Sequence, residues 1–375
     1  MAGIYIHIPF CKTRCVYCDF YTGTNESQMD AFVETLCAEA HTRKNEIAEP
    51  AKTVYFGGGT PSRLHREHFQ QIFETLFNAF SVEPDAEITL EANPDDLSVE
   101  YIQMLAALPF NRISIGIQSF NDEVLKFLSR RHSATQAIEA VKNCRKNGFH
   151  NISIDLMYGL PNQTLGIWQQ NLKQAVELDV QHISAYHLIY EEKTKLHALL
   201  RQHKIQPVSD ELSTKMFSML IDTLSQNGFE HYEISNFAKG KMYSIHNTSY
   251  WKNEKYLGLG PAAHSFDGDN RSWNAASLTQ YIQNTASGNA ERNIEYLSVY
   301  EKYNEFILTG LRTMWGVDLQ ELKNVFGAEF HDFCMKNAQK FIDNHLLKTE
   351  NHTLKLTREG IFISDGIMSE LMWVE

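Results

Sequence analysis

Six short runs rich in Val, Ile and aromatic residues recur through the first half of this chain, and they constrain its fold more than any other feature. They cover residues 4–8, 53–56, 87–91, 112–117, 151–156 and 182–188. The stretches between them, such as residues 28–45 and 135–147, have helical periodicity. Strands that alternate with helices predict a parallel sheet with crossover helices. Six such units favour an α/β fold that is a partial, open (β/α)6 TIM-like barrel over a closed barrel of eight units.

Polar and glycine-rich segments follow four of these runs. They are Gly57-Gly58-Gly59-Thr60-Pro61, Glu91-Ala92-Asn93-Pro94, Gln118-Ser119-Phe120 and the segment from Asp155 to Pro161. Ligands of (β/α) barrels bind at the carboxyl ends of the strands, so we expect these segments to face one mouth, beside the cysteine-containing loop after the first strand. Taken singly, the glycines are also compatible with a plain turn. Glu91 alone is also compatible with a solvated carboxylate at the end of a strand.

Three of the six cysteines lie within the first eighteen residues, in the pattern Cys11-x3-Cys15-x2-Cys18. Three thiolates suit an iron–sulfur cluster, and they leave one iron of a four-iron cluster without a protein ligand. A structural zinc site usually has four closed ligands, and the sequence has no second C-x2-C pair, although His7 is a candidate fourth ligand. A disulfide with one spare thiol is the other alternative, which a reducing cytosol disfavours.

Composition and charge narrow the class of function. The chain has 375 residues, of which 43% are hydrophobic and 21% charged, and its net charge is −12. This acidic balance argues against nucleic acid as a main partner, because phosphate binding needs a basic surface. No apolar run approaches the ~18 residues of a membrane span, and the N-terminus lacks the basic segment that opens a signal peptide. We therefore expect a cytoplasmic protein.

The pattern changes after about residue 235, which predicts three regions. Residues 1–235 form the barrel, residues 236–295 an aromatic, loop-rich connecting region, and residues 296–375 a C-terminal domain. In the last region helices precede a hairpin with strands at residues 346–349 and 353–356, and a final helix begins near Thr357. This order predicts a winged-helix-like α+β domain. The acidic balance of the chain argues against DNA binding by this domain and favours a lid or a partner-docking role.

Three motifs together resemble the radical S-adenosylmethionine (SAM) enzymes. They are the segment from Tyr5 to Cys18, Gly57-Gly-Gly-Thr-Pro61 and Gly116-Ile-Gln-Ser-Phe120. Within that superfamily the sequence is most similar to the branch that contains oxygen-independent coproporphyrinogen III oxidase (HemN) and the haem chaperones of the HemW type. The resemblance extends over roughly residues 5–266, and the C-terminal region also resembles the domain appended in this branch. It implies a radical SAM barrel followed by that domain.

The resemblance implies a [4Fe-4S] cluster and SAM as cofactors. The cluster would be bound by three cysteines, Cys11, Cys15 and Cys18. SAM would chelate the open iron, its methionyl part would lie along the glycine segment, and its ribose would be held by the carboxylate after the third strand. The positions that match SAM contacts in this branch are Tyr5, Tyr17, Gly58, Gly59, Thr60, Glu91, Gln118, Arg130, Asp155 and Ile189.

Two features separate the members of this branch. The oxidase type has a fourth cysteine two residues after the third, where this sequence has Phe20. The segment His246-Asn-Thr-Ser-Tyr250-Trp251 resembles the HNxxYW motif of the HemW type, which is associated with haem binding. The resemblance implies that His246 is an axial ligand of haem iron and that the two aromatic residues pack on the porphyrin. The plainer alternative is a structural histidine beside a core tryptophan.

The resemblance therefore implies a haem chaperone that carries a [4Fe-4S] cluster and SAM and transfers haem to an acceptor protein. Because a chaperone must release its cargo, the haem site should be partly open. The alternatives are an oxygen-independent coproporphyrinogen III oxidase, disfavoured by the missing fourth cysteine, and a radical SAM enzyme acting on another tetrapyrrole or small molecule. The resemblance also allows a cluster-linked homodimer and peripheral membrane association through the acceptor.

Overall fold

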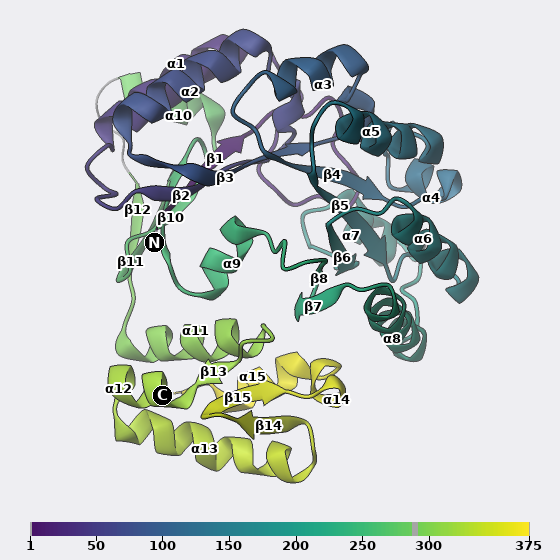
Figure 1. The fold of residues 1–375 in the computed structure, drawn as a ribbon, viewed down its shortest axis with the longest axis vertical. Helices are drawn as coiled ribbons and strands as arrows, with labels where there is room; N and C mark the ends of the chain where they lie inside the picture. The colour runs from purple at the N-terminus through teal and green to yellow at the C-terminus, as the bar shows by residue number, and fades with distance from the viewer. Residues whose placement is uncertain (1, 287–291, 375) are drawn as a thin grey trace.

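Six parallel strands form the centre of a curved, twelve-stranded sheet (Figure 1). The computed structural model describes residues 2–286 and 292–374, so residues 1, 287–291 and 375 of the predicted regions lie outside it. The six strands are neighbours in both sequence and space, each parallel to the next. They are β1 (Ala2–Ile8), β2 (Ala51–Gly58), β3 (Val82–Ala92), β4 (Arg112–Gln118), β5 (Asn151–Tyr158) and β6 (His182–His187). This topology confirms the predicted partial (β/α)6 barrel.

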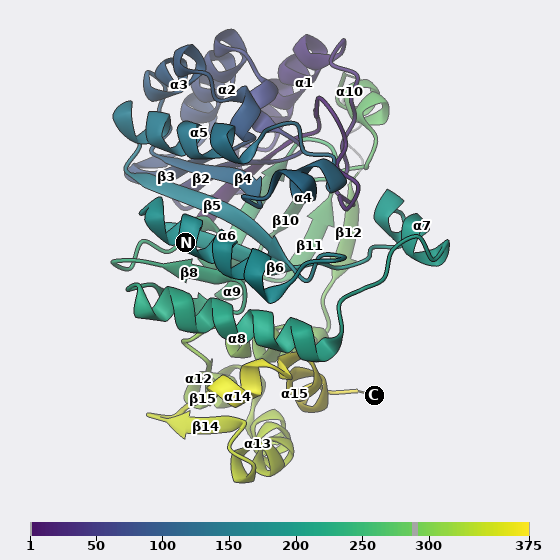
Figure 2. The same cartoon turned by 90° about the vertical axis from the view of Figure 1, so that its right-hand side faces the viewer.

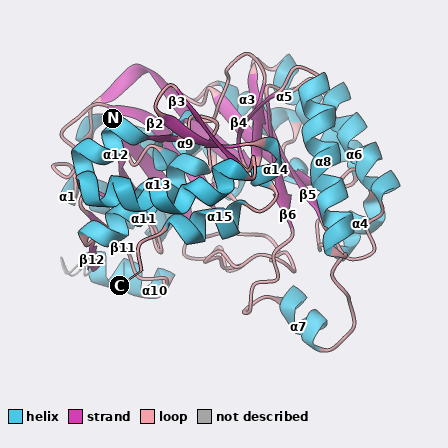
Figure 3. Cartoon of the chain, turned by 90° about the horizontal axis from the view of Figure 1, so that it is seen from below, coloured by secondary structure: helices cyan, strands magenta, loops and turns pink. Residues whose placement is uncertain are grey.

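Helices cover the convex side of this sheet and carry the chain from each strand to the next (Figures 1 and 2). The main ones are α1 (Met29–Thr42), α2 (Arg66–Ala79), α3 (Val99–Ala106), α5 (Ala134–Lys146), α6 (Leu165–Glu177) and α8 (Asp210–Gln226). Shorter helical segments lie in the connections: η1 (Pro61–Arg63), η2 (Pro94–Asp96), α4 (Asp122–Phe127) and α7 (Lys195–Arg201). Figure 3 shows α7 projecting away from the rest of the barrel.

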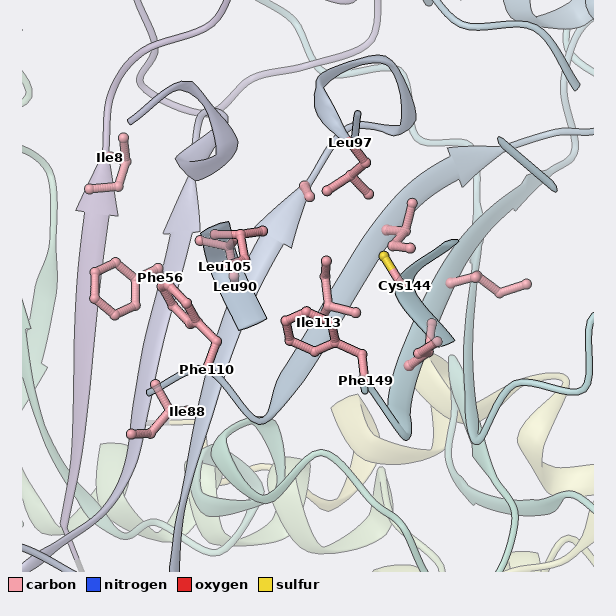
Figure 4. Close-up of a cluster of buried hydrophobic side chains, with 14 of the residues drawn as sticks. Ile8, Phe56, Ile88, Leu90, Leu97, Leu105, Phe110, Ile113, Cys144 and Phe149 are labelled. Carbon is pink, nitrogen blue, oxygen red and sulfur yellow. The ribbon is translucent and has the colours of Figure 1, made fainter. Parts of the chain in front are cut away.

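Alternation along the strands separates the apolar core from the barrel interior. On β1, Ile4, Ile6 and Ile8 are fully buried in the core beneath the helices, and the intervening Tyr5 and His7 point to the other side of the sheet. Equivalent apolar residues of the neighbouring strands form one continuous layer with the helices (Figure 4). Burying each such side chain stabilises the fold by ~1.5–3 kcal/mol. The interior is left to polar and aromatic groups.

The sheet continues beyond β1 in a region that the sequence predicted to be loop-rich. β9 (Lys255–Leu259) pairs parallel to β1, and an antiparallel meander of β10 (His264–Phe266), β11 (Asn270–Trp273) and β12 (Asn293–Tyr296) follows. These strands have three to five residues each, too few for a clear alternation of apolar and polar positions. At the opposite edge, β8 (Asn236–Ala238) runs antiparallel to β6, and β7 (Glu230–Glu233) runs antiparallel to β8.

Helix α9 (Ile245–Trp251) lies on the concave side of the sheet, between the strands and the C-terminal domain (Figure 1). Its first backbone N–H groups, those of Ile245 and His246, donate to the carboxylate of Glu87 on β3 at 3.1 and 3.0 Å. A carboxylate at a helix N-terminus satisfies free donors and favours the helix dipole. This contact fixes the start of α9 inside the barrel.

The C-terminal domain has its own apolar core and a three-stranded antiparallel sheet, in which β15 (Thr353–Leu356) lies between β13 (Val317–Asp318) and β14 (Leu347–Glu350). Asn351 and His352, both with positive φ, form a two-residue turn between the last two strands. Helices precede this hairpin, as predicted, and Figure 3 shows them in front of the barrel. The remaining elements are α10 (Leu278–Ala286), α11 (Val299–Leu311), α12 (Leu319–Phe326), α13 (Ala328–Asp343), α14 (Arg358–Ile361) and α15 (Ser364–Leu371). None of the described helices combines the length and apolar character needed to cross a membrane.

Candidate functional site

The cysteine loop follows the carboxyl end of β1, and backbone hydrogen bonds attach it to the segments after other strands. The Cys11 N–H donates to the carbonyl of Gly23 (2.8 Å). Val16 is buried in a small apolar cluster with Leu128 and Leu196. The Val16 N–H donates to the carbonyl of Leu128 (3.4 Å), and the Leu196 N–H donates to the carbonyl of Val16 (2.9 Å). The loop therefore lies across the mouth of the barrel, where the strands end.

Each of two thiols in this loop has a donor from another part of the mouth. The Thr60 hydroxyl donates to Cys11 Sγ (3.3 Å), and Arg130 Nη1 donates to Cys15 Sγ (3.6 Å). Burial raises the pKa of Cys11, and burial raises the pKa of Cys18 to about 11, so both are neutral thiols at pH 7. Metal binding replaces the thiol proton, and hydrogen-bond donors stabilise the resulting thiolate.

The three cysteine thiols are better suited to an iron–sulfur cluster than to a single metal ion. Among residues 2–286 and 292–374, no three His, Cys, Asp or Glu side chains gather around the position of a single metal ion. The ligands of a four-iron cluster each bind a different iron, so they lie further apart than the ligands of one ion. The three thiols are nevertheless close enough for their charges to interact, since ionised Cys15 and Cys11 both raise the pKa of Cys18.

The glycine segment at the end of β2 passes against β1. Gly58 has a φ of +101°, and a Cβ there would lie 2.5 Å from the ring of His7. A Cβ on Gly59 would lie 2.7 Å from the carbonyl oxygen of Ile8. The close approach of the two strands accounts for both glycines without a ligand. It also brings the next residue, Thr60, to the Cys11 thiol.

Two carboxylates lie on the concave side of the sheet, on β3 and β5. The Tyr55 hydroxyl donates to Glu91 Oε1 (2.6 Å). Burial and, to a lesser extent, the charge of Asp155 raise the pKa of Glu91 to about 7, although the hydrogen bond from Tyr55 acts to lower it. Burial likewise raises the pKa of Asp155 to about 6, opposed by hydrogen bonds to serine hydroxyls. Carboxylates that titrate near neutral pH in the interior of a barrel are candidates for binding a polar ligand.

A further predicted residue, Arg130, links the cysteine loop to the strand ends. Its Nη2 donates to Asn93 Oδ1 (2.6 Å) and to the carbonyl of Gly116. Asn93 Nδ2 in turn donates to Thr60 Oγ1 (3.2 Å), so Asn93 connects the donors of two cysteines. Sequence reasoning did not single out Asn93 as a site residue. Its position in a polar segment directly after a strand was the signal that could have found it.

The other predicted SAM contacts occupy different environments. Gln118 ends β4 with a φ of 69°, a strained conformation for a residue with a side chain. Tyr17 is half-buried in the cysteine loop, where burial raises its pKa. Tyr5 lies inside the barrel with its hydroxyl 3.1 Å from His7 Nδ1. Ile189, after β6, is 66% exposed.

The structure places His246 deep in the barrel, 1% exposed. Its Nδ1 shares a hydrogen bond with Thr53 Oγ1 (2.7 Å), and its Nε2 shares one with the Tyr250 hydroxyl (2.7 Å). Its ring stacks on that of Tyr55, with centroids 4.9 Å apart. Burial lowers its pKa to about 3, so the imidazole is neutral at pH 7. Either ring nitrogen would have to break an existing hydrogen bond before it could bind iron.

The two aromatic residues of the same motif line a cavity of about 560 Å³. Its walls also include Phe20 and Tyr21, which follow the cysteine loop, and Leu308 of α11. Strands β9 to β11 complete it with Tyr256, His264, Phe266 and Arg271. We call this space the aromatic cavity. It lies between the edge of the barrel and the C-terminal domain, and Phe20 at its wall is 61% exposed.

Comparison with known proteins gives the family. Residues 5–175 match the Radical SAM superfamily, and residues 297–363 match the HemN C-terminal domain. The chain is 33% identical to a protein of Lactococcus lactis named "Heme chaperone HemW", over 98% of this chain and 96% of that one. This chain belongs to the HemW family. The protein of the same name from Bacillus subtilis is 32% identical over 99% of both chains.

Among solved structures, the HemW-family chain resembles coproporphyrinogen III oxidase (HemN) from Escherichia coli, described as a radical SAM enzyme. The TM-score is 0.85 and the sequence identity 24%, with 99% of this chain and 90% of the other covered. This similarity establishes a shared fold over both the barrel and the C-terminal domain. Membership of the radical SAM superfamily implies a [4Fe-4S] cluster and SAM, and in this HemW-family chain the cysteine loop and its two donors fit such a group.

Proposed function

We propose that this protein is a haem chaperone, which binds haem and transfers it to an acceptor protein while carrying a [4Fe-4S] cluster and SAM. Full-length similarity to proteins named haem chaperone supports the proposal. The observation that carries it is the aromatic cavity, because Tyr250 and Trp251 of the HNxxYW motif both line it. Its volume is within the ~300–1,000 Å³ of small-molecule sites. Its exposed wall at Phe20 suits a cargo that must leave.

In this proposal Cys11, Cys15 and Cys18 would hold the cluster. When bound, the cluster together with SAM supplies one-electron radical chemistry. The protein's own part is to position and stabilise. Thr60 and Arg130 donate hydrogen bonds to the cysteine sulfurs. Donation to sulfur stabilises the thiolate form and tunes an iron–sulfur site.

The SAM positions in the proposal are those the resemblance implied. The backbone of Gly58 and Gly59 would lie along the methionyl part, and Glu91 would accept hydrogen bonds from ribose hydroxyls. With a pKa of about 7, Glu91 has a substantial ionised fraction at neutral pH, and hydroxyl donors would favour that form further. The proposed set is completed by Tyr5, Tyr17, Thr60, Gln118, Arg130 and Asp155.

The partners in this proposal are haem and a haem-acceptor protein. We further propose a cytoplasmic location, a homodimer linked through the cluster region, and peripheral membrane association through the acceptor. Size-exclusion chromatography with light scattering, before and after cluster reconstitution, tests the dimer. A monomer in both states would contradict it.

A haem titration of the anaerobically reconstituted protein tests the proposed function, with coproporphyrinogen III decarboxylation assayed on the same sample. Stoichiometric haem binding without decarboxylation is expected. The oxidase alternative predicts the reverse, SAM- and reductant-dependent loss of propionate carboxyls. Phe20, at the position of the oxidase's fourth cysteine, offers no thiol and argues against that alternative.

A further inference from the structure

The aromatic cavity contains an imidazole that is better placed to bind iron than His246. His264, on β10, lines the cavity and is exposed at its surface. Its ring stacks on Trp273 of β11, with centroids 5.4 Å apart and planes 19° from parallel. Within residues 2–286 and 292–374, neither of its ring nitrogens has a hydrogen-bond partner. Trp273 therefore holds one face of the His264 ring, and both ring nitrogens are available to bind a metal ion.

The other histidine of the cavity is already engaged. His7 Nε2 donates to the carbonyl of Tyr21 (2.9 Å), and His7 Nδ1 shares a hydrogen bond with the Tyr5 hydroxyl (3.1 Å). His246 does not line the cavity; it lies behind Tyr250, to which it is hydrogen-bonded. Burial, with the nearby charge of Arg271, lowers the pKa of His264, so its ring is neutral at pH 7. Neutral imidazole is the form that ligates haem iron.

The remaining walls suit a porphyrin. Tyr250, Trp251, Tyr256 and Phe266 provide ring surfaces for an aromatic macrocycle. Arg271 also lines the cavity; its Nη1 contacts Glu305 (2.6 Å). A guanidinium has five N–H donors, so Arg271 retains donors for a carboxylate such as a propionate. Glu254 and Glu305 are the acidic residues of the wall. Because Glu305 is itself paired with Arg271, a propionate would share that guanidinium with it.

We propose that haem binds in the aromatic cavity with His264 as an axial ligand of the iron and Arg271 as the partner of a propionate. In this assignment, which rests on the proposed function, His246 is a positioning residue that holds the Tyr250 ring in the cavity wall through its Nε2. Phe20 and Tyr21 come two and three residues after Cys18, so the cysteine loop and the haem site share one segment of the wall.

The test is a haem titration of the reconstituted full-length protein, followed by its Soret spectrum. The variants are His264→Ala, His246→Ala and the matched control His150→Ala, an exposed histidine outside the cavity. His264→Ala should shift the Soret band and weaken haem binding at least ~10-fold, the lower end of what loss of a supporting partner does to metal affinity. Added imidazole should restore the band of His264→Ala, which a purely structural defect would not allow. Iron and sulfide content should stay at the wild-type level.

The outcomes separate the inference from the proposed function. If the wild-type protein takes up no haem, the proposed function fails. If wild type binds haem, His264→Ala keeps its Soret band and His246→Ala loses it, the function stands and the ligand assignment is overturned. His246→Ala should weaken binding without changing the band, since its role is to position Tyr250. Arg271→Gln should weaken haem binding and leave the affinity for haem dimethyl ester, which has no free propionates, unchanged.

Discussion

A buried ion pair at the end of α1, packed against the extended edge of the sheet, should control both the stability of the fold and the wall of the aromatic cavity. Glu39 and Arg43 are 2% and 4% exposed, with Arg43 Nη1 donating to Glu39 Oε1 at 2.9 Å. Arg43 also donates to the carbonyl of Gly258 (2.7 Å) and to Ser265 Oγ (2.9 Å), and Ser265 follows His264 on β10. The pair therefore attaches the strands that carry His264 to a helix of the barrel.

Glu39 has further partners. Its carboxylate accepts hydrogen bonds from the Tyr281 hydroxyl (2.6 Å), Asn274 Nδ2 (2.7 Å) and the Gly260 N–H (2.9 Å). Glu39→Ala would leave the buried Arg43 cation with the partly exposed Glu46 (2.8 Å) as its remaining carboxylate partner, and it would remove the acceptor of the three donors named above. Breaking a buried ion pair in this way typically lowers the free energy of unfolding by ~3–5 kcal/mol. That is a large part of the ~5–15 kcal/mol of a whole protein. With a urea m-value near ~3 kcal/mol/M, the unfolding midpoint should fall by about 1 M or more.

Urea unfolding followed by far-UV circular dichroism measures this midpoint, with Glu211→Ala as the matched control. Glu211 is an exposed helical glutamate that pairs with Lys215, and its removal should leave the midpoint near wild type. The double variant Glu39→Met, Arg43→Met should recover part of the loss, because no buried charge is left unpaired. A midpoint for Glu39→Ala equal to that of the control would refute this reasoning.

Three further predictions concern the cysteine loop, the interior carboxylate and the cavity wall. Cys15→Ala should abolish the broad visible absorbance of the reconstituted protein; full iron and sulfide content would show that this thiol is not a ligand. Because the folded-state pKa of Glu91 is about 7, above the ordinary 4.5, folding favours its protonated form and stability falls as the pH rises between these values. Glu91→Gln should therefore gain stability relative to wild type between pH 5 and pH 8 in urea unfolding, and an equal difference at both pH values would contradict the assignment. Phe20→Ala should raise the Kd for haem and leave cluster iron unchanged, whereas an unaltered Kd would remove Phe20 from the haem site.

The barrel could be predicted because the sequence signals of its strands and helices are local. Each of the six parallel strands coincides with a run of β-branched and aromatic residues, and the helices between them have a clear period. The polar segments at the strand ends follow from the same reading, because parallel strands end at one edge. The hairpin of the C-terminal domain was likewise evident, although its first strand runs from Leu347 to Glu350, one residue later than expected.

What could not be predicted depends on contacts between distant segments. β9 pairs with β1 across about 250 residues of sequence, and its five residues carry no signal of that partner. Glu39 and Arg43 resemble the solvated charges of any helix, and only the extended sheet edge that packs on α1 buries them. The hydrogen bonds of His246 to Thr53 and Tyr250, which engage both ring nitrogens, also could not be predicted from the motif that contains it. The aromatic cavity, assembled from the cysteine loop, α9, α11 and the sheet edge, has no counterpart in any single stretch of sequence.

The most direct test of this account is anomalous diffraction at the iron edge from crystals of the reconstituted, haem-loaded protein. The account predicts two separate iron peaks. One is a multi-iron peak bounded by Cys11, Cys15 and Cys18, and the other is a single-iron peak in the aromatic cavity beside His264. A single-iron peak beside His246, or haem iron outside the cavity altogether, would contradict it.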